Sequence, residues 1–203
     1  MIRTEIHGST VNERVVAQAV EILENGGVII YPTDTVYGIG CTIEKKSAIE
    51  RIYRVKGMTK QKPLSFVCPD LKDIANYAKV DTAMYRIMRK YLPGPFTFIL
   101  PATRAVPKLL VSKQRTVGIR IPDHDLTLAI VGALGQPIIS TSVNISERTF
   151  ASDPQEFAAH YEGKVDMVID AGPAYSELSS VIDLTGPVPE ILRVGQGDVS
   201  WVD

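Results

Sequence analysis

Hydrophobic and polar residues follow two repeating patterns along the chain, one with helical spacing and one typical of short buried strands. Two capping boxes of the form S/T-x-x-E predict helix starts, Thr10 with Glu13 and Ser47 with Glu50. Apolar residues then recur at helical spacing over residues 15–23, and the Asn-Gly-Gly triplet at 25–27 ends that helix. The second helix is expected to stop near Gly57.

Further helices are predicted by turn-forming and capping residues. Asp70, Asp81 and Asp153 are expected to be N-caps, the last followed by a proline at the first helical position. Residues 126–134 form an amphipathic pattern that Gly135 stops. Short apolar runs predict strands at residues 28–31, 64–68, 96–100, 116–121, 138–141, 165–170, 181–184 and 191–194.

Strands alternate with helices over most of the length, and the last segments resemble a hairpin. This order predicts an α/β fold built around a single twisted, mixed β-sheet flanked by helices. The length of 203 residues and the lack of a long linker or repeat predict one domain over residues 1–203.

Composition excludes several protein classes. Hydrophobic residues make up 45% and charged residues 22%, as in ordinary globular proteins. No apolar run approaches the roughly 18 residues of a membrane span, and residues 1–10 lack a signal-peptide pattern. Cys41 and Cys68 form no C-x-x-C pair, so we expect small core residues in a cytoplasmic protein that does not contact membranes.

The formal net charge of −1 conceals a strong asymmetry. Residues 45–122 contain 17 basic and 4 acidic side chains, and residues 82–122 contain no acid. Residues 123–190 contain 11 acidic and 2 basic side chains. Concentrated positive charge favours an anionic ligand near the basic third, against the alternative of a solvated helix face.

Motifs for common chemistries are missing. The chain has no G-x-G-x-x-G, P-loop, H-E-x-x-H or G-x-S-x-G pattern. Its three histidines, His7, His124 and His160, lack metal-ligand spacing and are expected to be surface or capping residues.

Three polar segments at strand ends remain as candidate binding loops: residues 32–40, 56–64 and 140–146. The middle segment supplies Lys56, Lys60 and Lys62, and the last supplies four hydroxyls and an amide. Hydroxyl and amide donors without a nearby histidine suit binding of phosphate or an amino acid better than nucleophilic catalysis. Each segment also has the simpler interpretation of a turn that satisfies its own backbone.

Taken together, these segments resemble the YrdC/YciO family of threonylcarbamoyl-AMP synthases. The resemblance runs from the GGVIIYPTDT segment at 26–35 to the LRVG segment at 192–195. Between them lie KPL at 62–64, PGPFTF at 93–98, RIP at 120–122 and the pair Ser142-x-Asn144. The resemblance implies a mixed α/β domain with a concave basic groove, in which L-threonine, bicarbonate and ATP with Mg²⁺ form threonylcarbamoyl-AMP for t6A modification of tRNA.

The resemblance also implies roles for individual residues. Those matching threonine-contacting positions are Thr35, Arg120, Ser140 and Ser179. Those matching ATP-contacting positions are Lys62, Thr116, Ser142, Asn144 and Arg193. Lys56 matches the first lysine of the family's K-x-R motif, and Lys56 and Lys62 are the candidates for a direct catalytic role.

Four positions depart from the synthase pattern and favour the YciO-like branch. Met58 replaces the arginine of K-x-R and Thr59 the proline that follows it. Val67 stands where many members have histidine, and Phe150 stands where a serine is usual. A slow synthase is therefore one hypothesis. The alternative is a protein that binds tRNA or double-stranded RNA through the basic groove. Tyr85, Tyr91, Phe96 and Phe98 lie in the same acid-free segment, although their simpler interpretation is as core residues.

Overall fold

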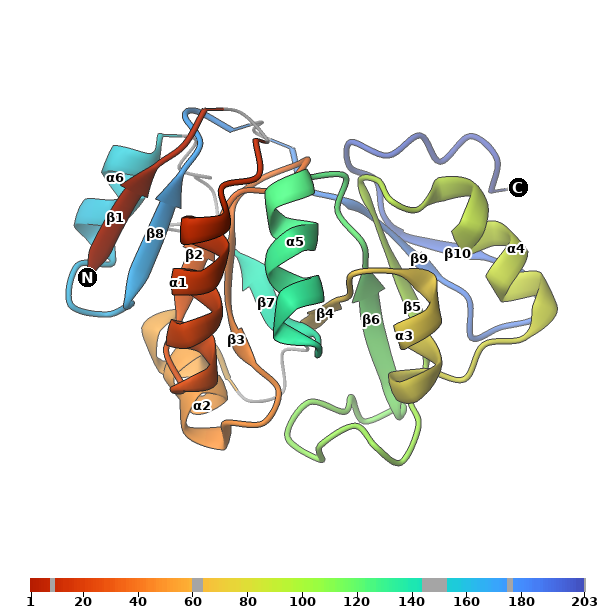
Figure 1. Cartoon of the computed structure of the whole chain (residues 1–203). Coiled ribbons are helices and arrows are strands. Elements are labelled where there is room, and N and C mark those ends of the chain that lie inside the picture. Colours follow the sequence, from red (N-terminus) through yellow and green to blue (C-terminus); the bar gives the residue numbers. More distant parts are fainter. Residues whose placement is uncertain (8–9, 60–63, 144–152, 175–176, 203) are drawn as a thin grey trace.

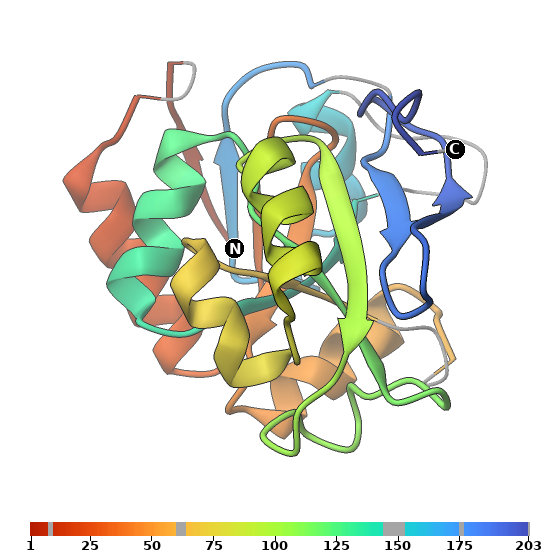
Figure 2. The same cartoon turned by 90° about the vertical axis from the view of Figure 1, so that its right-hand side faces the viewer.

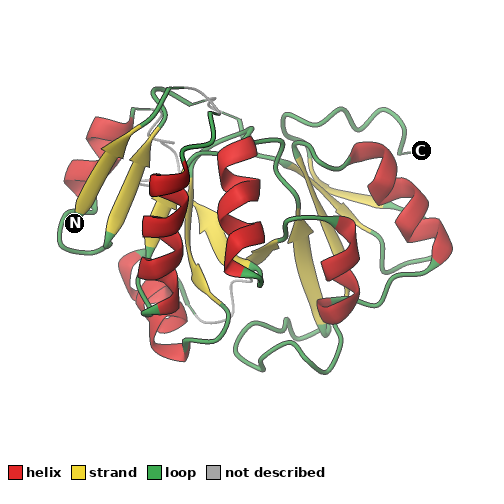
Figure 3. Ribbon diagram, viewed as in Figure 1, coloured by secondary structure: helices red, strands yellow, loops and turns green. Residues whose placement is uncertain are grey.

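The computed structural model describes residues 1–7, 10–59, 64–143, 153–174 and 177–202. Helices and strands alternate over much of these ranges (Figure 3), and Figure 2 shows the same arrangement turned by 90°. The helices are α1 (Glu13–Glu24), α2 (Lys46–Val55), α3 (Leu71–Tyr77), α4 (Thr82–Tyr91), α5 (Asp125–Leu134) and α6 (Pro154–His160). Over the described part of the chain, none of them is long and apolar enough to cross a membrane.

The strands assemble into one ten-stranded sheet in the order β1-β8-β2-β3-β7-β4-β6-β5-β9-β10. They are β1 (Ile2–Glu5), β2 (Ile29–Tyr31), β3 (Gly38–Thr42), β4 (Ser65–Val67), β5 (Phe96–Pro101), β6 (Thr116–Arg120), β7 (Ile138–Ser142), β8 (Met167–Asp170), β9 (Ser180–Asp183) and β10 (Glu190–Arg193). Parallel pairs such as β4 with β6 occur beside antiparallel pairs such as β5 with β6. The predicted mixed α/β sheet is confirmed.

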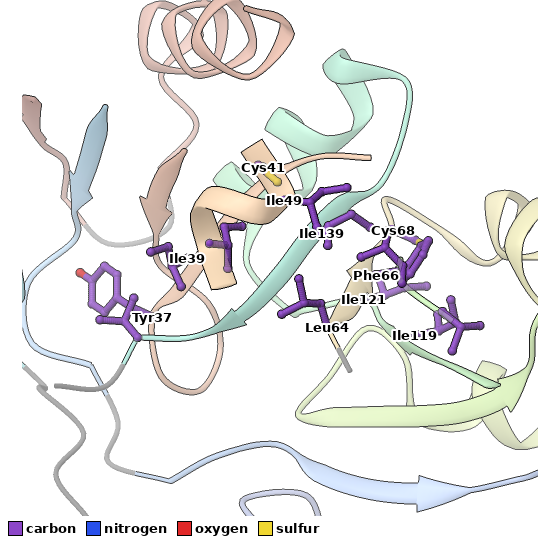
Figure 4. Packing of buried hydrophobic residues seen from close by; sticks show 14 of the residues in the cluster. Tyr37, Ile39, Cys41, Ile49, Leu64, Phe66, Cys68, Ile119, Ile121 and Ile139 are labelled. Atoms are coloured by element: carbon purple, nitrogen blue, oxygen red, sulfur yellow. The ribbon is translucent and has the colours of Figure 1, made fainter. Parts of the chain in front are cut away.

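Two apolar clusters cover opposite faces of this sheet. The smaller packs α1 and α5 against one face, through residues such as Leu23, Ile130 and Ile138. The larger covers the other face from Tyr37 to Ile119 (Figure 4). It also includes residues of α2, α3, α4 and α6. Because the sheet twists, α1, α5, α3 and α4 all lie on the near side in Figure 1, although they pack on two different faces.

The aspartate caps are confirmed, and the capping boxes are wrong. Asp70, Asp81 and Asp153 each accept hydrogen bonds from the first turn of their helices. Helix α1 begins later than predicted, with Asn12 as its N-cap, because the Asn12 carboxamide accepts from two backbone amides there. Helix α2 follows Lys45 and has no side-chain cap, so Ser47 lies inside the helix.

Two strands were not expected. Strand β1 pairs with β8 at the sheet edge, where only half of the side chains need to be apolar. Strand β3 overlaps the end of the segment 32–40, which was predicted as a loop because Gly38 and Gly40 resemble turn residues. A Cβ atom at Gly38 would lie 2.7 Å from the Tyr31 ring, so glycine is required for β3 to pass this ring.

Candidate functional site

A cavity of about 980 Å³ opens where the ends of several strands and helices meet. We call this the main cavity. Among the described residues, its lining contains the cations Lys56, Arg120 and Arg193 but no aspartate or glutamate. The other polar residues of the described lining are Tyr31, Thr33, Tyr37, Thr59, Ser65, Thr97, Ser140, Thr141, Ser142, His160, Tyr161 and Ser179. Such a surface is complementary to a negatively charged ligand.

Arg120, at the end of β6, is anchored by the turn that follows β2. Its Nη2 atom lies 2.6 Å from Asp34 Oδ1, 2.7 Å from Thr35 Oγ1 and 3.0 Å from Thr33 Oγ1. The Arg120 and Asp34 side chains are only 12% and 11% exposed. Among the described residues nothing accepts a hydrogen bond from Nη1, so this nitrogen is open to a ligand in the main cavity.

The Arg120–Asp34 pair carries unmet hydrogen-bonding capacity. Asp34 Oδ2 and Arg120 Nε are both buried without a partner in the described structure. Burial of polar atoms without partners costs free energy, so the arrangement is expected where a site is preorganised for a ligand.

Helix α5 is hydrogen-bonded to the turn that follows β2. The Thr127 hydroxyl donates to the Pro32 carbonyl at 2.6 Å, and buried His124 lies one turn earlier on the same side. Desolvation lowers the pKa of His124, although the charges of Asp34 and Asp125 act in the opposite direction. His124 is therefore held neutral next to the residues that anchor Arg120.

This histidine predicts a pH dependence of stability. Its folded-state pKa lies below the usual 6.5, so the unfolded chain binds more protons as the pH falls below that value. The stabilisation is expected to be complete above about pH 6.5 and to be lost as the pH falls through the folded-state pKa. We expect His124→Asn to flatten this decline in urea unfolding measured between about pH 7 and pH 5. Equal slopes of unfolding free energy against pH for the wild type and His124→Asn would contradict this prediction.

Ser140, on β7, is oriented by a tyrosine that the sequence interpretation did not single out. The Tyr31 hydroxyl donates to Ser140 Oγ at 2.6 Å, and both residues line the main cavity. Burial raises the pKa of Tyr31 to about 12, so the hydroxyl keeps its proton near neutral pH. Gly38 leaves the space that this ring and Ser140 occupy.

Arg193, on β10, is fixed by the chain just before β9. Its Nε and Nη2 atoms donate to the Ser179 carbonyl at 3.1 and 2.8 Å, and the Ser179 hydroxyl pairs with Thr97 Oγ1 at 2.9 Å. Desolvation, and then the positive charge of Arg120, lower the pKa of Arg193. The two guanidinium groups therefore repel each other across the main cavity, and a bound anion would relieve this repulsion.

A third cationic element comes from the ends of α2 and α6. The Lys56 ammonium donates to the Tyr161 hydroxyl at 3.3 Å. Burial raises the pKa of Tyr161 to about 12, while desolvation and the charges of Lys164 and Lys56 lower the pKa of His160. Met58 lines the same wall and also packs against the larger apolar cluster.

Comparison with known proteins identifies this architecture. The model of the Sua5/YciO/YrdC family, described as "Telomere recombination", matches residues 21–195. The chain belongs to the Sua5/YciO/YrdC family. Within this family it is 41% identical to the uncharacterized protein YciO of Escherichia coli K12, over 96% of this chain and 95% of that protein. The crystal structure of E. coli YciO superposes with a TM-score of 0.94 and 38% identity, over all of both chains.

Other members of the family have an assigned activity. The threonylcarbamoyl-AMP synthase of Bacillus subtilis is 30% identical over 91% of this chain and 54% of its own length. The structure of Pyrococcus abyssi Sua5 complexed with L-threonine superposes with a TM-score of 0.90 and 28% identity, over 96% of this chain and 58% of that one. This chain therefore spans about half the length of these synthases.

Most of the site residues expected from the family resemblance meet in the main cavity. Lys56, Arg120, Ser140, Ser142, Ser179 and Arg193 all line it, and Thr35 is bonded directly to Arg120. Lys62 and Asn144 lie outside the described residues, as does Phe150. Val67 lines the main cavity, so the position where many family members have histidine does face this space.

Thr116 is placed elsewhere. It begins β6, at the opposite end of the strand from Arg120, and its hydroxyl pairs with Ser112 Oγ at 2.7 Å. It is not among the described residues that line the main cavity. Strand membership of residues 116–121 was predicted, but which end of β6 faces the cavity depends on the neighbouring strands.

The main cavity also contains residues that sequence reasoning missed. Tyr31 and Thr33 flank the proline of the YPTDT segment, and Thr97 belongs to PGPFTF. Because these three residues lie inside motifs that the sequence analysis had noted, the sequence did offer a signal for them. Tyr161 had no such signal, because it follows α6 and reaches the cavity only through the packing of that helix.

Proposed function

We propose that the protein is a nucleotide-dependent enzyme that makes threonylcarbamoyl-AMP, or a close relative, from L-threonine, bicarbonate and ATP. The observation that supports this most is the pair of anchored arginines, Arg120 and Arg193, in one cavity whose described lining contains no acidic residue. Family membership and the similarity to a Sua5 protein complexed with L-threonine point to the same chemistry.

The amino acid would occupy the side of the main cavity near β6 and β7. Arg120 offers its free Nη1 to a carboxylate, and the Ser140 hydroxyl lies nearby on the neighbouring part of the sheet. Charged hydrogen bonds of this kind are among the strongest in proteins. In this proposal Thr35 and Ser179 complete the amino-acid site, Thr35 by fixing Arg120 and Ser179 from the opposite wall.

The nucleotide would occupy the side formed by Lys56, Ser142 and Arg193. Lys62, Thr116 and Asn144 belong to this proposed set on the family resemblance. ATP would enter as its Mg²⁺ complex, with the metal bound by phosphate oxygens. Over the described residues, no group of three or more His, Cys, Asp and Glu side chains is placed to hold a metal.

The reaction needs neutralised charge more than a strong base. The threonine amine and bicarbonate would condense to a carbamate with loss of water. A carbamate oxygen would then bond to the α-phosphorus while the bond from that phosphorus to the bridging oxygen breaks and pyrophosphate leaves. Two anions approach each other in this step, so Lys56, Arg120 and Arg193 would act by holding them together and stabilising the developing charge.

The test is pyrophosphate release with Mg²⁺–ATP and bicarbonate, measured with and without L-threonine. We expect release that depends on threonine and is slow because Met58 replaces the arginine of the motif. The nucleotide product is to be identified by mass as threonylcarbamoyl-AMP. Absence of threonine-dependent release together with absence of ATP binding would reject the proposal.

RNA binding remains the second prediction, and the structure weakens one reason for it. Phe96 and Phe98 are buried, and Tyr91 stacks on Trp201 at a centroid distance of 4.4 Å. Of the four aromatic residues that suggested a base-stacking surface, only Tyr85 is largely exposed. The aromatic part of the argument for RNA binding therefore rests on Tyr85, which is not among the described residues that line the main cavity.

A further inference from the structure

A second pocket, separate from the main cavity, lies where β5 ends and β6 begins. It has a volume of about 530 Å³ and is lined by Lys79, Ala102, Thr103, Arg104 and Arg115. Three of these five residues are cationic. The Arg115 end of β6 is separated from Arg120 by the length of the strand, about 15 Å at ordinary strand rise.

Backbone hydrogen bonds hold together the three segments that carry these cations, whose side chains are exposed. The Lys79 amide donates to the Pro101 carbonyl at 2.7 Å, next to an isolated bridge between Ala78 and Ala102. The Ala102 amide donates to the Arg115 carbonyl at 2.8 Å. The pocket is therefore built on a fixed frame that joins the end of α3, the end of β5 and the start of β6.

The positive charge of this pocket is not neutralised by the protein. Across the described ranges, no ion pair links Lys79, Arg104 or Arg115 to an acidic side chain. The segment 82–122, which supplies two of the three cations, contains no acid at all. Like charges held at one site repel each other, and a bound anion would offset that repulsion.

Arg115 occupies a backbone conformation that favours glycine. Its φ angle is +60°, and among the described non-glycine residues it is the only one with a positive φ. The Arg115 amide closes a turn on the Ser112 carbonyl at 3.0 Å, and Ser112 in turn donates to the Thr116 carbonyl at 3.3 Å. Glycine or asparagine is the usual residue at such a left-handed position, so an arginine here is strained. Strain of this kind is typical of functional positions.

From the cationic frame and the strained arginine, we propose that the second pocket binds a phosphate or diphosphate group of a small anion. Arg104 and Arg115 supply planar guanidinium donors, which match phosphate oxygens in pairs, and Lys79 supplies a point charge. The site is independent of the main cavity and does not rest on the synthase activity proposed above.

The experiment is a titration of the full chain with inorganic pyrophosphate, followed by the backbone amide resonances in two-dimensional NMR. Pyrophosphate is also expected to bind in the main cavity, and residue-by-residue isotherms separate the two sites. We expect saturable shifts at Thr103, Arg104 and Arg115 in addition to those near Arg193. Arg104→Ala and Arg115→Gly should each weaken pyrophosphate binding at the second pocket at least 10-fold and leave binding in the main cavity unchanged.

The matched control is Lys113→Ala, which removes one exposed positive charge from the same loop but does not line the pocket. Lys113→Ala should change the affinity of the second pocket for pyrophosphate less than 2-fold. Arg115→Gly also relieves the left-handed strain, so its thermal midpoint should lie between the wild-type value and about 2–4 °C above it. A midpoint in this range shows that the variant is folded.

Unchanged affinity in Arg115→Gly, or an equal loss in Lys113→Ala, would overturn the proposal. A short RNA duplex that shifts the same amides when pyrophosphate does not would also overturn it, because the ligand would then be a nucleic-acid backbone.

Discussion

Replacing Arg120 with alanine is expected to weaken L-threonine binding about 100-fold, because a charged hydrogen bond to a carboxylate in a closed site contributes about 3 kcal/mol. The same change is expected to lower the free energy of unfolding by about 3 kcal/mol, since Asp34, whose side chain is 11% exposed in the intact pair, would lose the guanidinium 2.6 Å away. Calorimetric titration with threonine and urea unfolding measure the two effects.

These two losses can be separated with a second substitution. In Arg120→Ala/Asp34→Asn the unpaired carboxylate is gone, so most of the lost stability should return while threonine binding stays weak. Asp34→Asn alone keeps an oxygen facing Nη2 but removes the charge, and should lie between wild type and Arg120→Ala in affinity. If the double variant recovers both stability and threonine binding, Arg120 does not contact the amino acid.

Introducing arginine at Met58 is expected to raise the rate of threonine-dependent pyrophosphate release by about 10- to 100-fold. Met58 lines the main cavity two residues after Lys56, so a longer cationic side chain there can reach the same space. Its thioether also packs against the larger apolar cluster, and a small loss of stability is expected with the substitution. The measurement is kcat/KM for threonine at saturating Mg²⁺–ATP.

Met58→Gln and Met58→Lys are the controls for this gain. Glutamine has a similar length without charge and should leave the rate near wild type, whereas lysine should give a partial gain because it lacks the paired donors of arginine. An arginine variant that binds ATP and threonine but is no faster than the glutamine variant would show that position 58 does not limit the reaction.

Local chemistry made much of the fold predictable. Asp70, Asp81 and Asp153 are caps because a carboxylate can accept from the free amides of a first helical turn, wherever the helix lies. The capping box at Thr10 was wrong because a second polar side chain nearby could cap the same helix. Asn12 competed with Thr10 for one helix start, and the residues alone do not show which side chain reaches the amides.

The glycines of β3 could not be interpreted locally. Gly38 and Gly40 suggest a turn in a one-dimensional pattern, yet they are small because Tyr31 and Ile138 lie against them from neighbouring strands. A residue selected for the space that a distant side chain needs has no signal in its own neighbourhood.

For the candidate site, the sequence determined which residues could act, through the polar segments at strand ends and their resemblance to one family. Only the tertiary structure decided which of them share a cavity. Arg120 and Thr116 end the same five-residue strand, but one enters the main cavity beside Asp34 and the other bonds to Ser112 at the far end. The physical reason is that strand order, twist and register arise from contacts between residues far apart in sequence, whereas propensities and caps depend on neighbours along the chain.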